Sequence, residues 1–89
     1  MQVTEVRIKK VDGEGRLKAY ASVTFDDVFV IHNVKIIEGT RGIFVAMPSR
    51  RVGNGEYKDV VHPLTTTFRN TIQESVISAY GKDDGTFEQ

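Results

Sequence analysis

The alternation of apolar and polar residues predicts β-strands in the first two thirds of the chain. In residues 16–25 every second residue is apolar, and the residues between them are polar or amphipathic. This period of two is typical of a strand with one buried face. Residues 3–11 alternate in the same way around Val6 and Ile8. We therefore expect two half-buried strands joined by a turn over residues 12–15.

Residues 28–37 form a longer apolar segment, VFVIHNVKII, with apolar side chains at both odd and even positions. A strand of this kind is expected at the centre of a sheet, covered on both faces. Asp26 and Asp27 precede it, and a connection of these two residues is short enough for a tight hairpin turn. Residues 38–42 (EGTRG) are interpreted as a loop, and residues 43–47 as a fourth strand.

A hairpin is expected after the fourth strand. Pro48 has no N–H to donate to a neighbouring strand, so it either ends that strand or lies at the edge of the sheet. Asn54 and Gly55 are a strong signal for a two-residue hairpin turn, in which both positions must accept positive φ. Residues 56–62 would return as a fifth strand. The segment 49–55 should therefore project as a flexible hairpin arm.

The periodicity changes after Pro63, where apolar residues recur every four positions, at Leu64, Phe68, Ile72 and Val76. This spacing predicts an amphipathic helix over residues 65–80. Thr65 or Thr66 can cap its first turn, and Gly81 stands where a left-handed C-cap is expected. Residues 82–89 are polar, and we expect a short frayed tail.

Five meandering antiparallel strands followed by one C-terminal helix make a two-layer α+β fold. The 89 residues suit a single domain, expected over residues 1–81. One helix covers only one face of the sheet, yet the neighbours Ile36 and Ile37 place apolar side chains on both faces. Apolar surface or an open strand edge would therefore be left over. A second copy related by a two-fold axis would cover it, so we expect a homodimer.

The residues that carry common enzyme chemistry are scattered. The chain has no cysteine, which excludes disulfides and thiolate metal sites. His32 and His62 stand far apart in sequence and are interpreted as structural residues. The serines lack a nucleophile motif, and the glycines match no phosphate-binding loop. We expect no catalytic residue, no metal site, no cofactor and no enzymatic activity.

Charge and hydropathy indicate where in the cell the protein is located and which partners suit it. No apolar run approaches the about 20 residues needed to span a bilayer, and the first ten residues lack a signal-peptide core. We therefore expect a cytoplasmic protein without membrane insertion. Net charge is zero, but residues 1–69 carry 11 basic and 8 acidic side chains, and the remainder is acidic. A mildly basic body is weak support for a nucleic-acid partner.

The adjacent arginines Arg50 and Arg51 are the main candidates for binding chemistry. Guanidinium groups bind phosphate bidentately, Lys58 returns on the partner strand, and Arg41 in the preceding loop is expected nearby. Three cations (Arg50, Arg51 and Lys58) limit the salt slope of duplex binding to about −2.7, and two arms in a dimer raise the limit to roughly −5. Useful affinity therefore requires the dimer. Tyr57 is the only aromatic residue of the arm, which gives little support for base stacking there.

Residues 44–64, FVAMPSRRVGNGEYKDVVHPL, resemble the central signature of the SpoVG (stage V sporulation protein G) family of small bacterial regulators. Further matches cover nearly the whole folded chain, in VTEVRI, EGRLKAYASVTFDD, FVIHNVKIIEG and IQESV. The resemblance implies a dimeric α+β protein of the bacterial cytoplasm that binds DNA, and in some cases RNA. It also implies roles in gene regulation, septation and sporulation.

The resemblance also implies which residues contact nucleic acid. The family's contacts are assigned to the basic pair after FVAMPS, here Arg50 and Arg51, and Lys58 matches the basic position of the E-aromatic-basic-D run. Residues 52–54 depart from the family's Thr-Pro-polar segment, so this arm should be looser. Two other interpretations stay open. The arginines could only keep a hairpin tip soluble, or the protein could be an interaction module of the division machinery that binds no nucleic acid.

Overall fold

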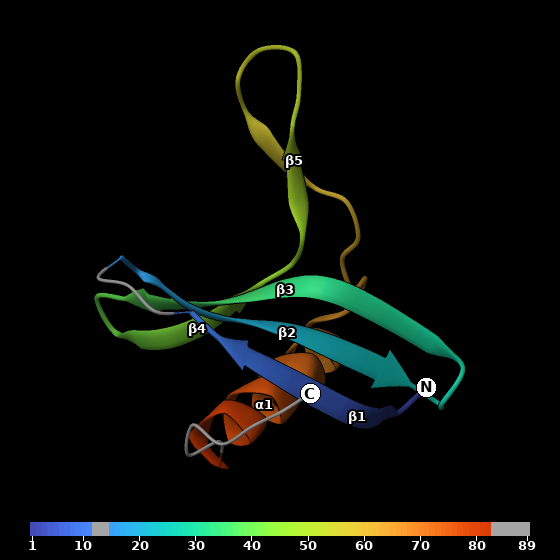
Figure 1. The fold of residues 1–89 in the computed structure, drawn as a ribbon. Helices are drawn as coiled ribbons and strands as arrows, with labels where there is room; N and C mark the ends of the chain where they lie inside the picture. The colour runs from blue at the N-terminus through green and yellow to red at the C-terminus, as the bar shows by residue number, and fades with distance from the viewer. Residues whose placement is uncertain (12–14, 83–89) are drawn as a thin grey trace.

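A computed structural model describes residues 1–11 and 15–82 of the chain (Figure 1). The turn expected over residues 12–15 and the tail expected over 82–89 therefore lie outside the described residues, apart from Gly15 and Lys82. Within these two ranges, six strands and one helix follow in order: β1 (Val3–Lys10), β2 (Leu17–Phe25), β3 (Phe29–Gly39), β4 (Gly42–Ala46), β5 (Ser49–Arg51), β6 (Tyr57–Asp59) and α1 (Thr66–Lys82).

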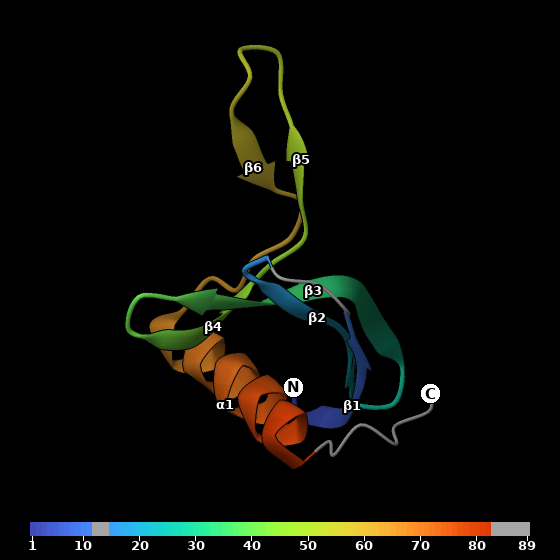
Figure 2. The same cartoon turned by 60° about the vertical axis from the view of Figure 1, so that its left-hand side comes forward.

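The first four strands form an antiparallel sheet in the order β1-β2-β3-β4, and α1 packs against one face of it. Strands β5 and β6 form a separate two-stranded sheet. Figures 1 and 2 show the helix below the large sheet and the small sheet standing above it, on the opposite side. The expected two-layer α+β class is confirmed.

The core lies between the sheet and the helix. Ten apolar side chains are buried there, and no polar or charged side chain among the described residues is buried. The strands contribute every second residue, and the helix contributes one stripe, as their periods require. The buried side chains are Ile8, Ala19, Ala21, Val23, Phe25, Val34, Ile36, Met47, Ile72 and Val76.

A β-bulge in β3 explains the apolar segment that the sequence suggested was covered on both faces. Val23 pairs with Ile31 and Ala21 pairs with Val34, so two residues of β3, His32 and Asn33, stand opposite Ser22. Asn33 has a φ of 65°, a conformation that asparagine tolerates better than most residues. The extra residue reverses the alternation along the strand. Apolar residues at odd positions before the bulge and at even positions after it therefore lie on the same face.

The expectation that both faces of this strand are covered is consequently wrong. The helix contacts β1, β2 and β4 from one side. On the other face, Val30 and His32 are exposed. Ile36 is fully buried, whereas its neighbour Ile37 is only partly buried. Less apolar surface is left over than the sequence suggested.

The turns on either side of β3 are tight. Asp26 and Asp27 have φ values of 52° and 57°, and the Val28 N–H donates to the Phe25 carbonyl at 3.0 Å. The predicted tight connection is confirmed. At the other end the strands run further than predicted, and only residues 40–41 separate β3 from β4.

Helix α1 begins where the threonines predicted it. The Phe68 N–H donates to the Thr65 hydroxyl oxygen at 3.1 Å, so Thr65 is the N-cap. Two details of the helix prediction were wrong. Gly81 lies inside the helix without positive φ, and is therefore not a left-handed C-cap. Leu64 precedes the helix and is 92% exposed, so it does not belong to the buried stripe.

Candidate nucleic-acid interface

The most protruding part of the molecule is the hairpin of residues 49–59, here called the arm (Figure 2). The fifth strand predicted over residues 56–62 is shorter, and it pairs with β5 rather than extending the large sheet. Pro48 separates β4 from β5, as its missing N–H leads one to expect. The arm closes at its base through the Val60 N–H, which donates to the Pro48 carbonyl at 2.8 Å.

The turn at the tip differs from the prediction. The Gly55 N–H donates to the Val52 carbonyl at 2.9 Å, and the Val52 N–H donates to the Glu56 carbonyl at 2.8 Å. Gly55 has a φ of 88°, but Asn54 does not have positive φ. This is a three-residue hairpin loop, in which a glycine in the left-handed region forms a bulge, rather than a two-residue turn. The Asn54 Oδ1 accepts from the Glu56 N–H at 3.1 Å.

Strand pairing determines which cations of the arm lie together. Arg50 stands directly opposite Lys58, and Arg51 stands opposite Tyr57. Directly opposed residues have their side chains on the same face, whereas neighbours along a strand point to opposite faces. The structure therefore brings Arg50 together with Lys58. It places Arg51, its neighbour in sequence, on the other face with Tyr57.

The face with Arg50 and Lys58 is cationic and open to solvent. Both residues are exposed, and neither forms an ion pair with any residue that the structure describes. Like charges directly opposite each other destabilise a strand pair. An anion bound between them would relieve this repulsion. A phosphate or a carboxylate can accept charge-assisted hydrogen bonds from both side chains, because the planar guanidinium matches the geometry of either anion.

The second face combines a cation with an aromatic ring. Tyr57 is 69% exposed, and the Arg51 Nη2 lies 3.7 Å from the position that a Cβ on Gly55 would occupy. The Arg51 guanidinium thus folds toward the turn and stays exposed. Asp59 is on the same face, opposite Ser49, but it makes no ion pair with Arg51. This face can also meet a phosphate.

Arg41 was predicted to lie near the arm, and the fold separates them. It lies in the turn before β4, whereas the arm begins beyond the other end of that strand (Figure 1). Five residues of strand span about 16 Å at roughly 3.3 Å per residue. Arg41 is exposed but is not part of the same cluster.

The two histidines lie apart and have structural contacts. The His32 Nδ1 and the Ser22 hydroxyl oxygen are 2.9 Å apart, and the His62 Nδ1–H donates to the Pro63 carbonyl at 3.0 Å. Within residues 1–11 and 15–82, no three histidine, aspartate or glutamate side chains gather where they could hold a metal ion. None of the helical segments in the described part of the chain is long and apolar enough to cross a membrane.

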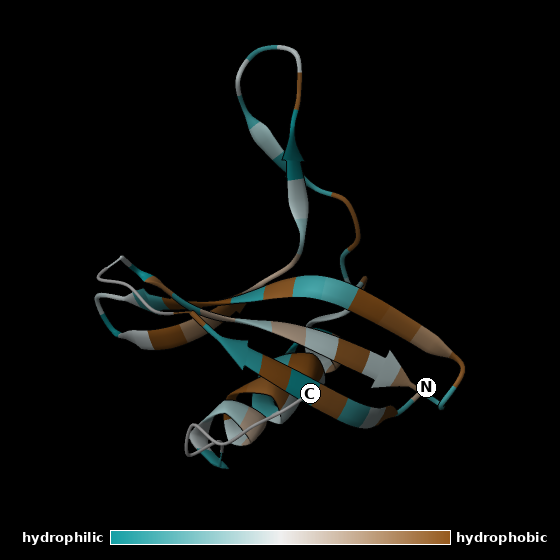
Figure 3. Ribbon diagram, in the orientation of Figure 1, coloured by the Kyte–Doolittle hydropathy of each residue, from teal (hydrophilic) through white to brown (hydrophobic). Residues whose placement is uncertain are grey.

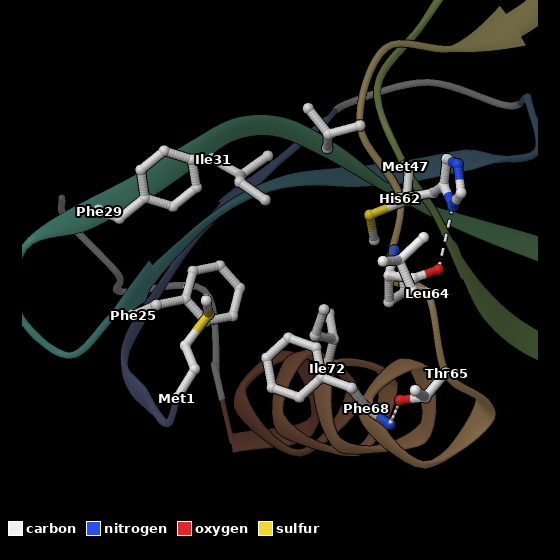
Figure 4. A pocket seen from close by; sticks show the side chains of 12 residues that line it. Met1, Phe25, Phe29, Ile31, Met47, His62, Leu64, Thr65, Phe68 and Ile72 are labelled. Atoms are coloured by element: carbon white, nitrogen blue, oxygen red, sulfur yellow. Dashed lines mark hydrogen bonds between the residues drawn. The ribbon is translucent and has the colours of Figure 1, made fainter.

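The sequence did not predict an apolar pocket of about 440 Å³ between the sheet and the start of α1. Figure 4 shows Phe25, Phe29 and Ile31 on the sheet side, and Phe68 and Ile72 on the helix side. The ring centroids of Phe25 and Phe68 are 5.7 Å apart. Exposed apolar residues adjoin this pocket, among them Phe29, which is 54% exposed. The signal for it in the sequence was the apolar run Val28-Phe29-Val30, which exceeds what one buried face requires.

Comparison with known proteins gives a consistent match. A family model described as SpoVG matches residues 1–82. A protein of Clostridium botulinum (strain Alaska E43 / Type E3) is 52% identical over 82 residues, which are 92% of this chain and 90% of that protein. A protein of Caldicellulosiruptor saccharolyticus is 55% identical over 80 residues, covering 90% and 91% of the two chains. Both are named "Putative septation protein SpoVG".

Proposed function

The chain belongs to the SpoVG family, and we propose that it is a non-enzymatic regulator that binds nucleic acid as a homodimer through its two arms. The observation that carries the proposal is the pairing of Arg50 with Lys58 on an exposed hairpin, without a carboxylate partner among the described residues. Two unpaired cations in direct opposition are unfavourable unless they meet an anion. A polynucleotide supplies anions at a regular spacing.

Because Arg50 and Arg51 lie on opposite faces, the arm suits a groove better than a flat surface. The major groove of DNA admits a two-stranded ribbon and has a phosphate chain on either side. An inserted arm can therefore use the cations of both faces. An arm lying flat on the backbone would use only one face. Contacts of this kind position the protein without reading sequence, so we expect limited selectivity and binding to DNA, with RNA as a second polyanion.

Two arms are required for useful affinity. Three phosphate contacts by one arm correspond to a salt slope of at most about −2.7, which describes a weak non-specific binder. The exposed apolar residues around the pocket support a second copy as the missing partner, since contiguous apolar surface favours association. The relatives' names place the family in septation, so we propose that this regulation bears on cell division and sporulation in the cytoplasm.

The proposal is tested by removing the arm's arginines. The variant Arg50→Ala/Arg51→Ala should lose most binding to a fluorescent duplex, because each protomer loses two phosphate contacts. We expect a decrease of about tenfold or more at moderate salt, and a salt slope shallower by up to about 3.6 for a dimer. Fluorescence anisotropy at several salt concentrations measures both quantities, and circular dichroism verifies the fold.

The matched control is Arg69→Ala/Lys82→Ala, which removes the same charge from α1 on the other side of the sheet. It should bind nearly as the natural protein does. Unchanged binding of duplex DNA and of RNA by the folded arm variant would refute the proposal. Equal losses in both double variants would mean that net charge, rather than the arm, controls binding.

A second candidate function is favoured by the apolar pocket. In this interpretation the chain is an interaction module, and its pocket accepts an apolar side chain from a protein of the division machinery, without any nucleic acid. This interpretation predicts that Phe29→Lys fails to restore normal division in a deletion strain, whereas Arg50→Ala/Arg51→Ala restores it. Complementation of a deletion strain with each variant separates the two functions. Failure of the arginine variant supports nucleic-acid binding. Because the second copy is proposed to cover the same pocket, failure of Phe29→Lys favours the interaction module only if the arginine variant complements.

A further inference from the structure

The face of the large sheet that points away from α1 carries an ordered row of polar side chains. Lys9 pairs with Tyr20, and Tyr20 pairs with Lys35 on its other side. The ring of Tyr20 therefore lies between two lysines on three adjacent strands. The apolar neighbours Ile8, Ala19 and Ala21 are buried in the core, so this row must face outward. Tyr20 and Lys35 are partly buried, and Lys9 is exposed.

A second row lies beside the first. Arg7 pairs with Ser22, and the bulge of β3 places His32 next to them, with its Nδ1 2.9 Å from the Ser22 hydroxyl oxygen. A hollow of about 520 Å³ lies between Lys9 and Tyr20 of the first row and Arg7, Ser22 and His32 of the second. Lys35 lies outside its lining, on the other side of Tyr20. The bulge matters here, because the reversed alternation at Asn33 turns His32 outward while the apolar residues before and after it face the core.

The charge of this face is positive. Arg7, Lys9 and Lys35 are accompanied by Glu5, whose carboxylate forms an ion pair with the Arg7 Nε at 2.7 Å. The remaining charge is carried by the two lysines that flank Tyr20. A second copy of the chain meeting this face with its own would oppose like charges, which disfavours a two-fold contact here.

This face and the arm are on the same side of the molecule. Figures 1 and 2 both show the arm rising from the side of the large sheet opposite to α1. Figure 3 shows the arm mostly teal and white, while β1–β3 carry alternating brown and teal bands. The row and the arm are also close along the chain, because Lys35 pairs with Ala46, three residues before the arm begins at Ser49.

We propose that the outer sheet face binds single-stranded nucleic acid, with an unpaired base stacked on Tyr20 and the adjoining phosphates contacted by Lys9 and Lys35. Aromatic rings flanked by cations on an open sheet are the usual platform for unpaired bases, because every base has a face that stacks. A paired base is stacked on its neighbours and cannot reach a ring at the level of a sheet. This inference rests on the proposed function and extends it from phosphate contacts at the arm to base contacts on the sheet.

The test compares a twelve-nucleotide oligo-dT, an abasic strand of the same length and a twelve-base-pair duplex, each with a fluorescent label. Tyr20→Ala should weaken oligo-dT binding about tenfold, the typical loss for one stacked base. Tyr20→Phe should retain it, since the ring remains. Neither change should affect the abasic strand or the duplex. A Tyr20→Ala variant that binds oligo-dT as tightly as the natural chain would overturn the proposal.

A spectroscopic measurement avoids any loss of stability in the alanine variant. The chain has three tyrosines and no tryptophan, so Tyr57→Phe/Tyr80→Phe leaves Tyr20 as the only tyrosine. Oligo-dT should quench its emission, whereas the abasic strand should not. Unchanged emission at saturating oligo-dT would contradict stacking, and so would equal quenching by poly-glutamate, which indicates a site for acidic protein.

The same experiments distinguish this inference from the proposed function. Arg50→Ala/Arg51→Ala should weaken binding of all three oligonucleotides, because it removes phosphate contacts. Lys9→Ala/Lys35→Ala should weaken only the single strands and reduce their salt slope by about 1.4 per protomer. If the arm variant has its effect and the Tyr20 and lysine variants have none, the inference fails and the arm proposal stands. If only the arm variant lacks an effect, the arm proposal fails.

Discussion

The arm and the sheet-helix body differ in what holds them in place. The body contains all ten of the buried side chains among the described residues, whereas no residue of the arm is buried. The arm depends on backbone hydrogen bonds, on the left-handed Gly55 and on its base at Pro48. An isolated two-stranded hairpin is marginal in water. Stability and binding are therefore assigned to separate parts of one small chain.

The largest expected effect is in the body. Phe25 is 2% exposed and its ring contacts those of Phe29 and Phe68. Phe25→Ala should lower the free energy of unfolding by about 3–5 kcal/mol, because it removes a buried ring and leaves a cavity. Urea denaturation followed by circular dichroism measures the change. The matched control is Phe44→Ala, which should cost less than about 1 kcal/mol because Phe44 is 43% exposed. Similar losses in both variants would contradict the distinction between core and surface.

Removal of the arm should have the opposite effect, with binding lost and stability retained. Replacing residues 50–58 with Asn-Gly would join Ser49 to Asp59, which pair across the arm, by a two-residue turn. The free energy of unfolding should change by less than about 1 kcal/mol, since no buried residue is lost. Binding of duplex DNA should disappear in the same anisotropy assay. A strongly destabilised variant would show that the arm is part of the body after all.

A smaller effect is expected at the bulge that defines the outer face. Asn33 has a φ of 65°, which alanine adopts only with strain, so Asn33→Ala should destabilise the body by about 1 kcal/mol. Asn33→Gly, which accepts this φ, should differ from the natural protein by no more than about 0.5 kcal/mol. Urea denaturation of the two variants decides the point. Equal stability of both would mean that the left-handed conformation at this position is not required.

The smallest effect is expected at the tip of the arm. Gly55→Ala strains a φ of 88° by roughly 1 kcal/mol without creating a close contact. The thermal midpoint of the body should not move, while duplex binding should weaken up to about fivefold as the arm loses its geometry. Gly53→Ala is the control, because Gly53 has open space around it and no positive φ. A shift of the midpoint by Gly55→Ala alone would link the tip to the core.

Periodicity was sufficient for the fold class and for the elements of the sheet-helix body, but not for the short strands of the arm. Alternation in β2 and the four-residue spacing in α1 follow directly from burial on one face, so both were predictable. The bulge was not, because a one-residue slip at His32-Asn33 cannot be distinguished by pattern from a strand that is apolar on both faces. Gly81 was misassigned for a related reason. A glycine near a helix end suggests a stop, but nothing local prevents the helix from continuing to Lys82.

The sequence identified the cations of the arm but not how they are arranged. The adjacency of Arg50 and Arg51 suggested one cluster, and strand pairing instead combines Arg50 with Lys58. Arg41 seemed close because few residues separate it from the arm, but β4 lies between them. The outer face could not be seen at all, since Lys9, Tyr20 and Lys35 meet only through long-range strand register.

The central claim is that the cations of two arms meet one polyanion, and the most direct test is the salt dependence of duplex binding by the natural protein, with its mass in solution determined in the same buffers. We predict a dimer and a slope of log K against log salt that is steeper than −2.7 and approaches about −5. Single substitutions at Arg50 and at Arg51 should each make it shallower. A monomer, or a dimer whose binding hardly changes between low and high salt, would contradict the account.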